Sequence, residues 1–152
     1  MNNKLKILIF EGPDRAGKTT LKKKLIKERN DILFIDRFTG TNTVYRSIKP
    51  DREEAPESEF ERLEALLNEQ FPVLLVCCVA PPEVLTERIF ETQEEDHFGD
   101  QREDIYQKMK ILDQGFREYF NKTKFSNKIL LDTSKVDEEK SLLIIKEELK
   151  KL

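Results

Sequence analysis

A glycine-containing stretch near the N-terminus has the residue types and spacing of a phosphate-binding loop. The sequence GPDRAGKT at residues 12–19 fits the pattern G-x-x-x-x-G-K-[ST]. Gly12 and Gly17 allow backbone conformations that other residues disfavour, so successive N–H groups can point at one phosphate. Lys18 would reach the β- and γ-phosphates of a nucleoside triphosphate, and the Thr19 hydroxyl would hold Mg²⁺. The stretch therefore predicts a site for a nucleotide polyphosphate and its metal ion.

Asp36 and Arg37 form a second group that could do chemistry. Four apolar residues at 32–35 precede Asp36, which is the pattern of a buried strand that ends in an acid. Such an acid lies at the carboxyl end of its strand, where open α/β sheets bind their ligands. It can hold Mg²⁺ directly or through water, and Arg37 adds a cation beside it.

The apolar pattern indicates the elements that would position these residues. Four short apolar runs predict buried strands at residues 5–10, 32–36, 73–79 and 129–131. Helical patterns lie between them and after the last one. This alternation predicts an α/β fold with a parallel sheet and helices on both faces. The nucleotide site would then lie at the carboxyl edge of the strands.

Apolar residues three or four positions apart predict the helices. Leu21 and Leu25 follow the phosphate-binding loop. Ser58 would cap a helix that contains Phe60, Leu63 and Leu67 at helical spacing. Later helices are predicted to open at Pro81-Pro82, to run over residues 102–121, and to begin near residue 137.

Composition limits the class of protein. The 152 residues suffice for one domain, residues 1–152, with its own hydrophobic core. Charged residues make up 38% of the chain, and no apolar run approaches the length of a membrane span. The net charge of −3 excludes an overall basic surface for nucleic acid. We therefore expect a cytoplasmic protein in which the adjacent Cys77 and Cys78 are reduced core residues.

Several segments together resemble thymidylate kinases. The sequence FEGPDRAGKTT at residues 10–20 is similar to the family signature F-E-G-x-D-[GR]-[AS]-G-K-[ST]-T, and FIDRF at residues 34–38 resembles the family's Asp-Arg-aromatic motif. Residues 73–89, 100–120 and 129–140 resemble later segments of the family in the same order. The resemblance covers most of the chain. It implies the three-layer P-loop kinase fold and phosphoryl transfer from ATP to a nucleotide.

The resemblance also assigns roles to individual residues, with ATP as donor, Mg²⁺ as cofactor and a small nucleotide as acceptor. The residues implied for ATP are Gly12, Asp14, Arg15, Ala16, Gly17, Lys18, Thr19 and Thr20, and those implied for Mg²⁺ are Thr19 and Asp36. The residues implied for the acceptor are Asp14, near its sugar hydroxyl, Arg37, on its phosphate, Phe38 and Tyr45. Lys18, Arg15, Asp36 and Arg37 would be the catalytic residues.

Arg15 indicates which branch of the family the chain resembles. One branch has a catalytic arginine in the phosphate-binding loop, and the other has it in the lid. The lid-like stretch at residues 89–101 contains no arginine or lysine, so the chain resembles the first branch. A guanidinium at this position can bridge donor and acceptor phosphates as negative charge moves between them. The alternative for Arg15 is an ordinary surface salt bridge.

The chain departs from the family after the first helix. A family strand with an Arg-Glu-Pro-Gly motif, which helps to bind the monophosphate, has no counterpart here. We therefore expect four core strands in the order 2-1-3-4, with the strand at residues 32–36 at an edge. The family's glutamine-bearing motif after Asp-Arg is also absent. Residues 38–47 are either a connection that enters a helix with Tyr45 packed inside, or a wall of the acceptor site.

The favoured function is ATP-dependent transfer to a deoxynucleotide, namely dTMP or a related deoxynucleoside monophosphate. A first alternative is a deoxynucleoside or polynucleotide kinase, with a nucleic-acid end as an acceptor and Glu11 or Asp36 as the base. A second alternative is a nucleotide-binding switch, although the Asn-Lys-x-Asp motif of GTPases is absent. Because members of the family are often dimers, a homodimer is a further candidate partner, and no membrane partner is expected.

Overall fold

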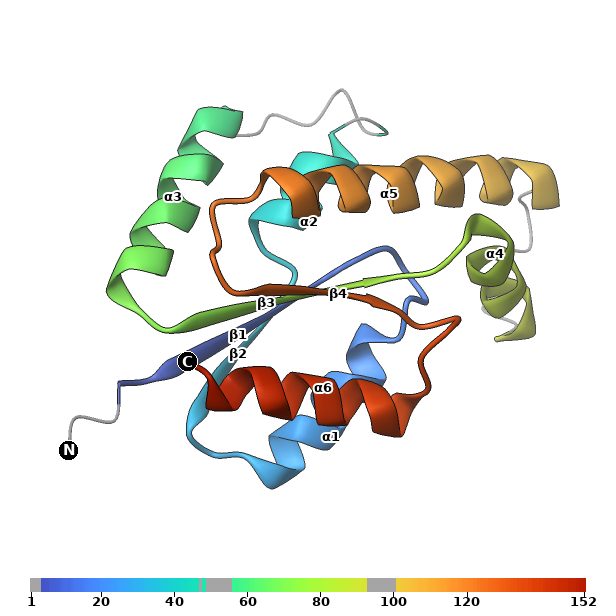
Figure 1. Cartoon of the computed structure of the whole chain (residues 1–152). Coiled ribbons are helices and arrows are strands. Elements are labelled where there is room, and N and C mark those ends of the chain that lie inside the picture. The colour runs from blue at the N-terminus through green and yellow to red at the C-terminus, as the bar shows by residue number, and fades with distance from the viewer. Residues whose placement is uncertain (1–3, 47, 49–55, 93–100) are drawn as a thin grey trace.

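A four-stranded parallel sheet forms the centre of the computed structural model, which describes residues 4–46, 48, 56–92 and 101–152. The strands are β1 (Lys6–Glu11), β2 (Ile32–Asp36), β3 (Val73–Val79) and β4 (Lys128–Asp132). They lie in the order β2-β1-β3-β4, and each neighbouring pair is parallel (Figure 1). The predicted order 2-1-3-4 is therefore confirmed, with β2 at an edge.

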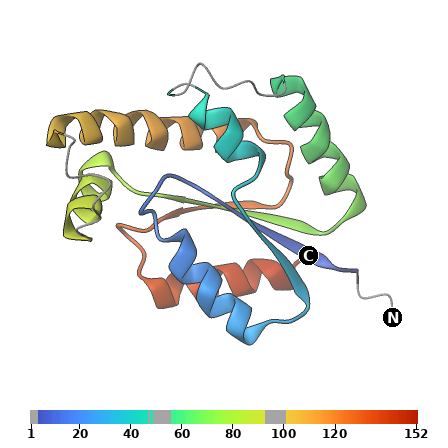
Figure 2. The ribbon, with the colours of Figure 1, turned by 180° about the vertical axis from the view of Figure 1, so that it is seen from behind.

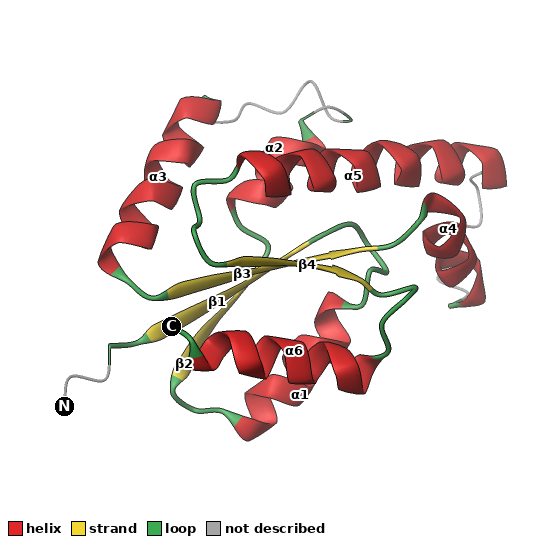
Figure 3. Ribbon diagram, viewed as in Figure 1, coloured by secondary structure: helices red, strands yellow, loops and turns green. Residues whose placement is uncertain are grey.

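Helices cover both faces of the sheet, as predicted. One face carries α1 (Lys18–Glu28) and α6 (Glu138–Lys150), and the other carries α2 (Thr39–Tyr45), α3 (Glu57–Gln70) and α5 (Arg102–Lys122) (Figure 3). The view from behind shows the same three layers (Figure 2). The remaining helix, α4 (Pro82–Glu91), follows β3 and packs against α5.

The central strands are apolar because both of their faces are covered. All seven residues of β3 are buried, and so are all residues of β1 after Lys6. The two edge strands keep exposed apolar residues, Leu33 in β2 and Leu130 in β4. Cys77 and Cys78 are buried free thiols in β3, as predicted.

The strand register brings the predicted chemical groups to one edge of the sheet. Phe10 of β1 pairs with Asp36 of β2, so the phosphate-binding loop and Asp36 leave the sheet side by side. Gly12 passes so close to β3 that a Cβ atom there would lie 2.0 Å from the carbonyl oxygen of Cys78. The loop therefore leaves β1 in a direction that only a glycine at position 12 permits.

The segment at residues 38–47 contains α2, a short helix that packs against α5 and α3 on one side of the sheet. Tyr45 is buried, and its ring meets that of Phe116 edge to face at 6.4 Å between centroids. A Cβ atom on Gly40 would lie 2.5 Å from a ring carbon of Tyr119, so the glycine permits this close packing. Of the two interpretations of this segment, the one with Tyr45 packed inside agrees with the structure.

The face that α3 turns inward differs from the predicted one. Leu63 is 43% exposed, whereas Glu64 is only 2% exposed. The carboxylate of Glu64 is buried because it accepts hydrogen bonds from the hydroxyls of Thr39 and Tyr119, at 2.6 and 2.5 Å, and from the Thr123 hydroxyl at 3.0 Å. The predicted cap is also wrong, because Pro56 precedes the helix and no side chain caps it.

Parts of two predicted loops lie outside the described residues. These are residues 49–55, within the acidic stretch before α3, and residues 93–100, within the lid-like stretch. Among the helices that the structure describes, none combines the length and apolar character needed to cross a bilayer.

Candidate active site

The phosphate-binding loop joins β1 to α1 and turns back on itself. Gly12 and Gly17 have positive φ angles of 139° and 92°, which side-chain-bearing residues rarely adopt. The Ala16 N–H donates to the Pro13 carbonyl at 3.3 Å, which closes the turn. Because α1 begins at Lys18, directly after the turn, the positive end of its dipole faces the loop. The predicted order of strand, loop and helix is confirmed, and this arrangement attracts anions.

Lys18 is buried beneath the loop. Its ammonium group donates to the carbonyl oxygens of Gly12 at 2.6 Å and of Pro13 at 2.7 Å. Burial lowers the pKa of Lys18, and the nearby charge of Arg37 lowers it further. Phosphate oxygens carry full charge and bind an ammonium more strongly than neutral carbonyls do. Lys18 can therefore exchange its present partners for phosphate.

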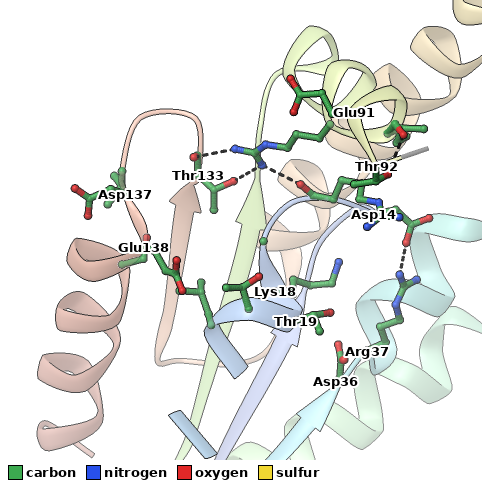
Figure 4. Close-up of a pocket in the computed structure, with 18 residues that line it drawn as sticks. Asp14, Lys18, Thr19, Asp36, Arg37, Glu91, Thr92, Thr133, Asp137 and Glu138 are labelled. Atoms are coloured by element: carbon green, nitrogen blue, oxygen red, sulfur yellow. Dashed lines mark hydrogen bonds and ion pairs between the residues drawn. The ribbon is translucent and has the colours of Figure 1, made fainter. Parts of the chain in front are cut away.

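A cavity of about 650 Å³ opens along the loop and the start of α1 (Figure 4). This volume is within the range of small-molecule sites. The predicted residues that line it are Asp14, Arg15, Gly17, Lys18, Thr19, Thr20, Asp36 and Arg37. Gly12 and Ala16 are buried in the loop, and neither they nor Phe38 and Tyr45 are among the lining residues.

Arg15 has an unusual backbone conformation at the mouth of the loop. Its φ is 66°, in the left-handed region. Its carbonyl oxygen accepts a hydrogen bond at 2.9 Å from the guanidinium of Arg88 in α4. The same guanidinium donates to the hydroxyl and the carbonyl of Thr133, at 2.9 and 3.0 Å. Arg88 thus joins the loop to the segment after β4.

Asp14, Arg37 and Tyr45 form a second cluster at the β2 side of the cavity. Arg37 makes an ion pair with Asp14, and the Tyr45 hydroxyl donates to the other carboxylate oxygen at 3.4 Å. The Arg37 guanidinium also lies 5.8 Å from the centre of the Tyr45 ring. Partial burial opposes ionisation of Asp14, but the hydrogen bond and charge of Arg37 hold its pKa below the ordinary value. The cluster keeps a guanidinium beside the phosphate-binding loop.

Two solved structures resemble the protein over nearly its whole length. The YorR protein of Bacillus subtilis, solved in complex with phosphorylated GDP, has a TM-score of 0.77 at 20% identity, with 95% of each chain covered. Thymidylate kinase of Candida albicans has a TM-score of 0.64 at 13% identity, over 97% of this chain and 92% of that chain. The protein has a thymidylate kinase-like P-loop kinase fold. No protein-family model and no curated protein matches the sequence.

P-loop kinases use Mg²⁺, and the residues of this site fit such an ion. The Thr19 hydroxyl and the Asp36 carboxylate are oxygen donors that line the same cavity and could hold the ion. Asp36 presently accepts from Lys22 at 2.7 Å. Within the described part of the chain, no three His, Cys, Asp or Glu side chains gather as a metal site of their own. Mg²⁺ commonly binds through one or two protein oxygens together with substrate phosphates and water, and this donor set suits that mode.

Glu11 lies in the interior of the fold and has a structural role. Its side chain is fully buried, where its two oxygens accept from the Phe38 N–H at 2.6 Å and the Thr41 hydroxyl at 2.5 Å. Burial raises the pKa of Glu11. Because its oxygens are occupied away from the cavity, Glu11 does not have the placement of a catalytic base. It fixes the turn between β2 and α2 instead.

Arg88 and Thr133 are among the cavity-lining residues to which sequence reasoning assigned no role. Arg88 lies on a helix with an otherwise ordinary amphipathic pattern, and Thr133 lies in a short polar turn. The hydrogen bond from Arg88 to Arg15 joins residues 73 positions apart, and the one from Arg88 to Thr133 joins residues 45 positions apart. No pattern of neighbouring residues predicts contacts of this kind. The catalytic and binding roles assigned to the other residues stay predictions.

Proposed function

We propose that the protein transfers the γ-phosphoryl group of ATP to a deoxynucleoside monophosphate, with dTMP as the first candidate. The observation that carries the proposal is a second guanidinium, that of Arg37, on the same cavity as the phosphate-binding loop. Binding of ATP occupies the loop, whereas transfer to a monophosphate also requires an anion site within reach of the first. We assign this second anion site to Arg37.

On the donor side, the loop N–H groups, the start of α1 and Lys18 would hold the β- and γ-phosphates. Mg²⁺, bound through Thr19 and Asp36, would neutralise charge on the same phosphates. Arg15 would contact the γ-phosphoryl group as it moves. These groups stabilise charge that spreads over the transferred oxygens, which is the main requirement of phosphoryl transfer.

On the acceptor side, Arg37 would exchange the carboxylate of Asp14 for the phosphate of the acceptor. An oxygen of that phosphate then forms a bond to the γ-phosphorus, while the bond from the γ-phosphorus to the bridging oxygen breaks. The products are ADP and a nucleoside diphosphate. A monophosphate oxygen is already ionised near neutral pH, since the second phosphate pKa is about 6, so the step needs no base.

The state of the carboxylates supports a monophosphate over a nucleoside as acceptor. A nucleoside hydroxyl needs a base to remove its proton. Glu11 is fully buried and occupied, while Asp14 is ion-paired with Arg37 and Asp36 with Lys22. An aspartate whose pKa is lowered by an arginine is a poor base. These contacts favour the reaction in which the acceptor brings its own charge.

A larger acceptor is the second candidate, because β2 is an edge strand. The side chains of Arg37 and Asp14 are 40% and 48% exposed, and among the described residues no strand lies beyond β2 in the sheet. The phosphorylated end of an oligonucleotide would approach Arg37 from this open side. Both candidate reactions would use the same two anion sites. They differ only in whether the acceptor is a mononucleotide or the end of an oligonucleotide.

The test is ADP release from Mg-ATP in the presence of a panel of acceptors. The panel contains the deoxynucleoside monophosphates, the corresponding deoxynucleosides, and oligonucleotides with 5′-hydroxyl or 5′-phosphate ends. We expect strong stimulation by one monophosphate, with loss of at least about a hundredfold in Lys18→Ala. Lys23→Ala is the matched control, because Lys23 is exposed on α1 and lies outside the cavity lining.

The opposite results are equally definite. Stimulation by nucleosides alone would contradict the monophosphate proposal and return Asp36 to the role of base. Full turnover in Lys18→Ala would contradict the donor site. Slow hydrolysis that no acceptor stimulates would contradict phosphoryl transfer and favour a nucleotide-binding switch.

A further inference from the structure

Arg15 needs help to keep its backbone conformation. Among the described residues, only Arg15 and Arg37 have positive φ without being glycine. In this region the Cβ atom of an L-residue crowds its own carbonyl, so the conformation persists only where neighbouring contacts enforce it. The conformation also decides where a side chain points. What holds the backbone of Arg15 therefore controls the direction of its guanidinium.

Arg88 contacts this backbone from outside the loop. One terminal nitrogen of its guanidinium donates to the Arg15 carbonyl at 2.9 Å and to the Thr133 hydroxyl at 2.9 Å. The other terminal nitrogen donates to the Thr133 carbonyl at 3.0 Å. Three acceptors fix a planar, rigid fork much better than one would. The position of the Arg15 carbonyl is thereby tied to that of Thr133.

Thr133 is itself fixed to the sheet. Its N–H donates to the carbonyl of Val79, the last residue of β3, at 2.9 Å. The chain of contacts therefore runs from β3 through Thr133 and Arg88 to Arg15. Because β3 is among the most buried parts of the molecule, this series of hydrogen bonds connects the loop to a rigid element.

We propose that Arg88 is a positioning residue for Arg15, which acts on transfer by holding the Arg15 carbonyl and so keeping the side chain directed at the moving phosphoryl group. The inference rests on the proposed function of Arg15. Arg88 also lines the cavity, so a direct contact between Arg88 and the nucleotide is the competing explanation. The two explanations predict different single-turnover rates for the variant in which Arg88 and Arg15 are both substituted.

A double-mutant cycle separates them. The single-turnover rate at saturating Mg-ATP and acceptor is measured for the wild type, Arg88→Met, Arg15→Ala and the double variant. We expect Arg88→Met to lower the rate at least tenfold in the wild-type background and less than twofold in Arg15→Ala, with the KM for ATP within twofold in both. Arg88→Lys should recover little, since an ammonium cannot reproduce the planar fork.

Two outcomes would overturn the inference. Losses that multiply in the double variant would mean that Arg88 acts independently of Arg15. A rise in the KM for ATP that matches the fall in rate would mean that Arg88 binds the nucleotide. Arg29→Met is the matched control, because Arg29 pairs with Asp31 at the far end of α1 and should leave every parameter unchanged.

A milder variant guards against loss of folding. Thr133→Val keeps the shape of the side chain and removes one of the three acceptors of Arg88. We expect a several-fold fall in rate in the wild-type background and none in Arg15→Ala. Equal falls in the two backgrounds would contradict the inference.

A structural measurement keeps the inference separate from the proposed function. In a crystal structure of Arg88→Met, we expect the φ of Arg15 to leave the left-handed region. An unchanged φ would overturn the inference, whatever the activity of the protein. Failure of every acceptor in the panel would instead overturn the proposed function and leave this measurement valid.

Discussion

The two halves of the cavity hold their arginines by different means. Arg15 and Arg37 share almost the same backbone angle, with φ of 66° and 65°. The backbone of Arg15 is held through its carbonyl by Arg88, a side chain from a distant helix. The backbone of Arg37 is held by the sheet, because its N–H donates to the Phe10 carbonyl at 2.9 Å and the next N–H donates to Glu11.

This difference suits the two tasks. In the proposed reaction, the donor half, which contains Arg15, would present a guanidinium to a phosphoryl group that moves, and a contact from the Arg88 side chain can hold it in position. The acceptor half, which contains Arg37, would receive a ligand at a fixed point. Arg37 lies at the end of β2 and forms an ion pair with the carboxylate of Asp14. We expect the acceptor phosphate to take the position of this carboxylate. The comparison predicts that variants of the two halves change different kinetic constants.

The largest expected effect belongs to Arg15→Ala. The guanidinium would contact the γ-phosphoryl group mainly during transfer, so its loss should lower the single-turnover rate by about a thousandfold. The affinity for ATP should change only a few-fold. Rapid-quench kinetics and titration with a fluorescent ATP analogue measure the two quantities. Equal losses in rate and affinity would demote Arg15 to an ordinary binding residue.

Arg37→Ala should show the opposite pattern. Because Arg37 would bind the acceptor phosphate before and during transfer, its loss should raise the KM for the acceptor by about ten- to a hundredfold, as for a charge-assisted hydrogen bond. The KM for ATP should stay within twofold. Steady-state kinetics with either substrate varied measure both constants. An unchanged acceptor KM would break the division of the cavity into two halves.

Glu11→Ala tests how the acceptor half is supported. The substitution leaves the Phe38 N–H and the Thr41 hydroxyl without their buried partner, which should lower the free energy of unfolding by about 1–3 kcal/mol. Denaturant titration measures this loss. Glu11→Gln should lose less, because an amide oxygen still accepts from Phe38. The acceptor KM should rise with the ATP KM unchanged, and a rise in both would mean that Glu11 supports both halves.

Of the four variants, Asp14→Asn should have the smallest effect. The effect is on the free energy of unfolding, and it should depend on pH. The pKa of Asp14 is lowered in the folded protein, so its ionised form stabilises the fold above the unfolded pKa of about 3.9. That stability is lost as the pH falls through the lower folded value. Since the pair is half-exposed, the wild type should exceed Asp14→Asn by less than about 1 kcal/mol at pH 6. Urea titrations from pH 6 to pH 3 should show the difference shrinking, and a constant difference would contradict this account.

Local patterns predicted most of the fold. The ranges predicted for β2 and β3 agree with the structure, because each is an apolar run bounded by polar residues or proline. The P-loop was found because its glycines, lysine and threonine are consecutive in sequence. In both cases the physical cause lies within a few neighbouring residues. The strand order came instead from the resemblance to thymidylate kinases, because the family strand that follows the first helix has no counterpart in this chain.

Long-range polar contacts account for what sequence reasoning missed. Glu64 occupies the inward face of α3, where the spacing of Leu63 predicted an apolar residue, because its partners come from α2 and from the end of α5. In the sequence, Arg88 cannot be distinguished from a solvent-facing arginine, because its acceptors lie in the phosphate-binding loop and in the connection between β4 and α6. Burial of a charge depends on partners that only the folded chain supplies.

The edge position of β2 has a consequence for how a protein of this fold can change. Among the described residues, no strand pairs with the outer side of β2, and Asp36 and Arg37 lie at its end. A segment inserted between α1 and β2 can add a strand there without disturbing the pairing of β1 with β3. Such an insertion would add new walls around the proposed acceptor site and leave the P-loop unchanged. If the proposed function is correct, substrate choice can therefore evolve, or be engineered, through an added segment without any change to the donor site.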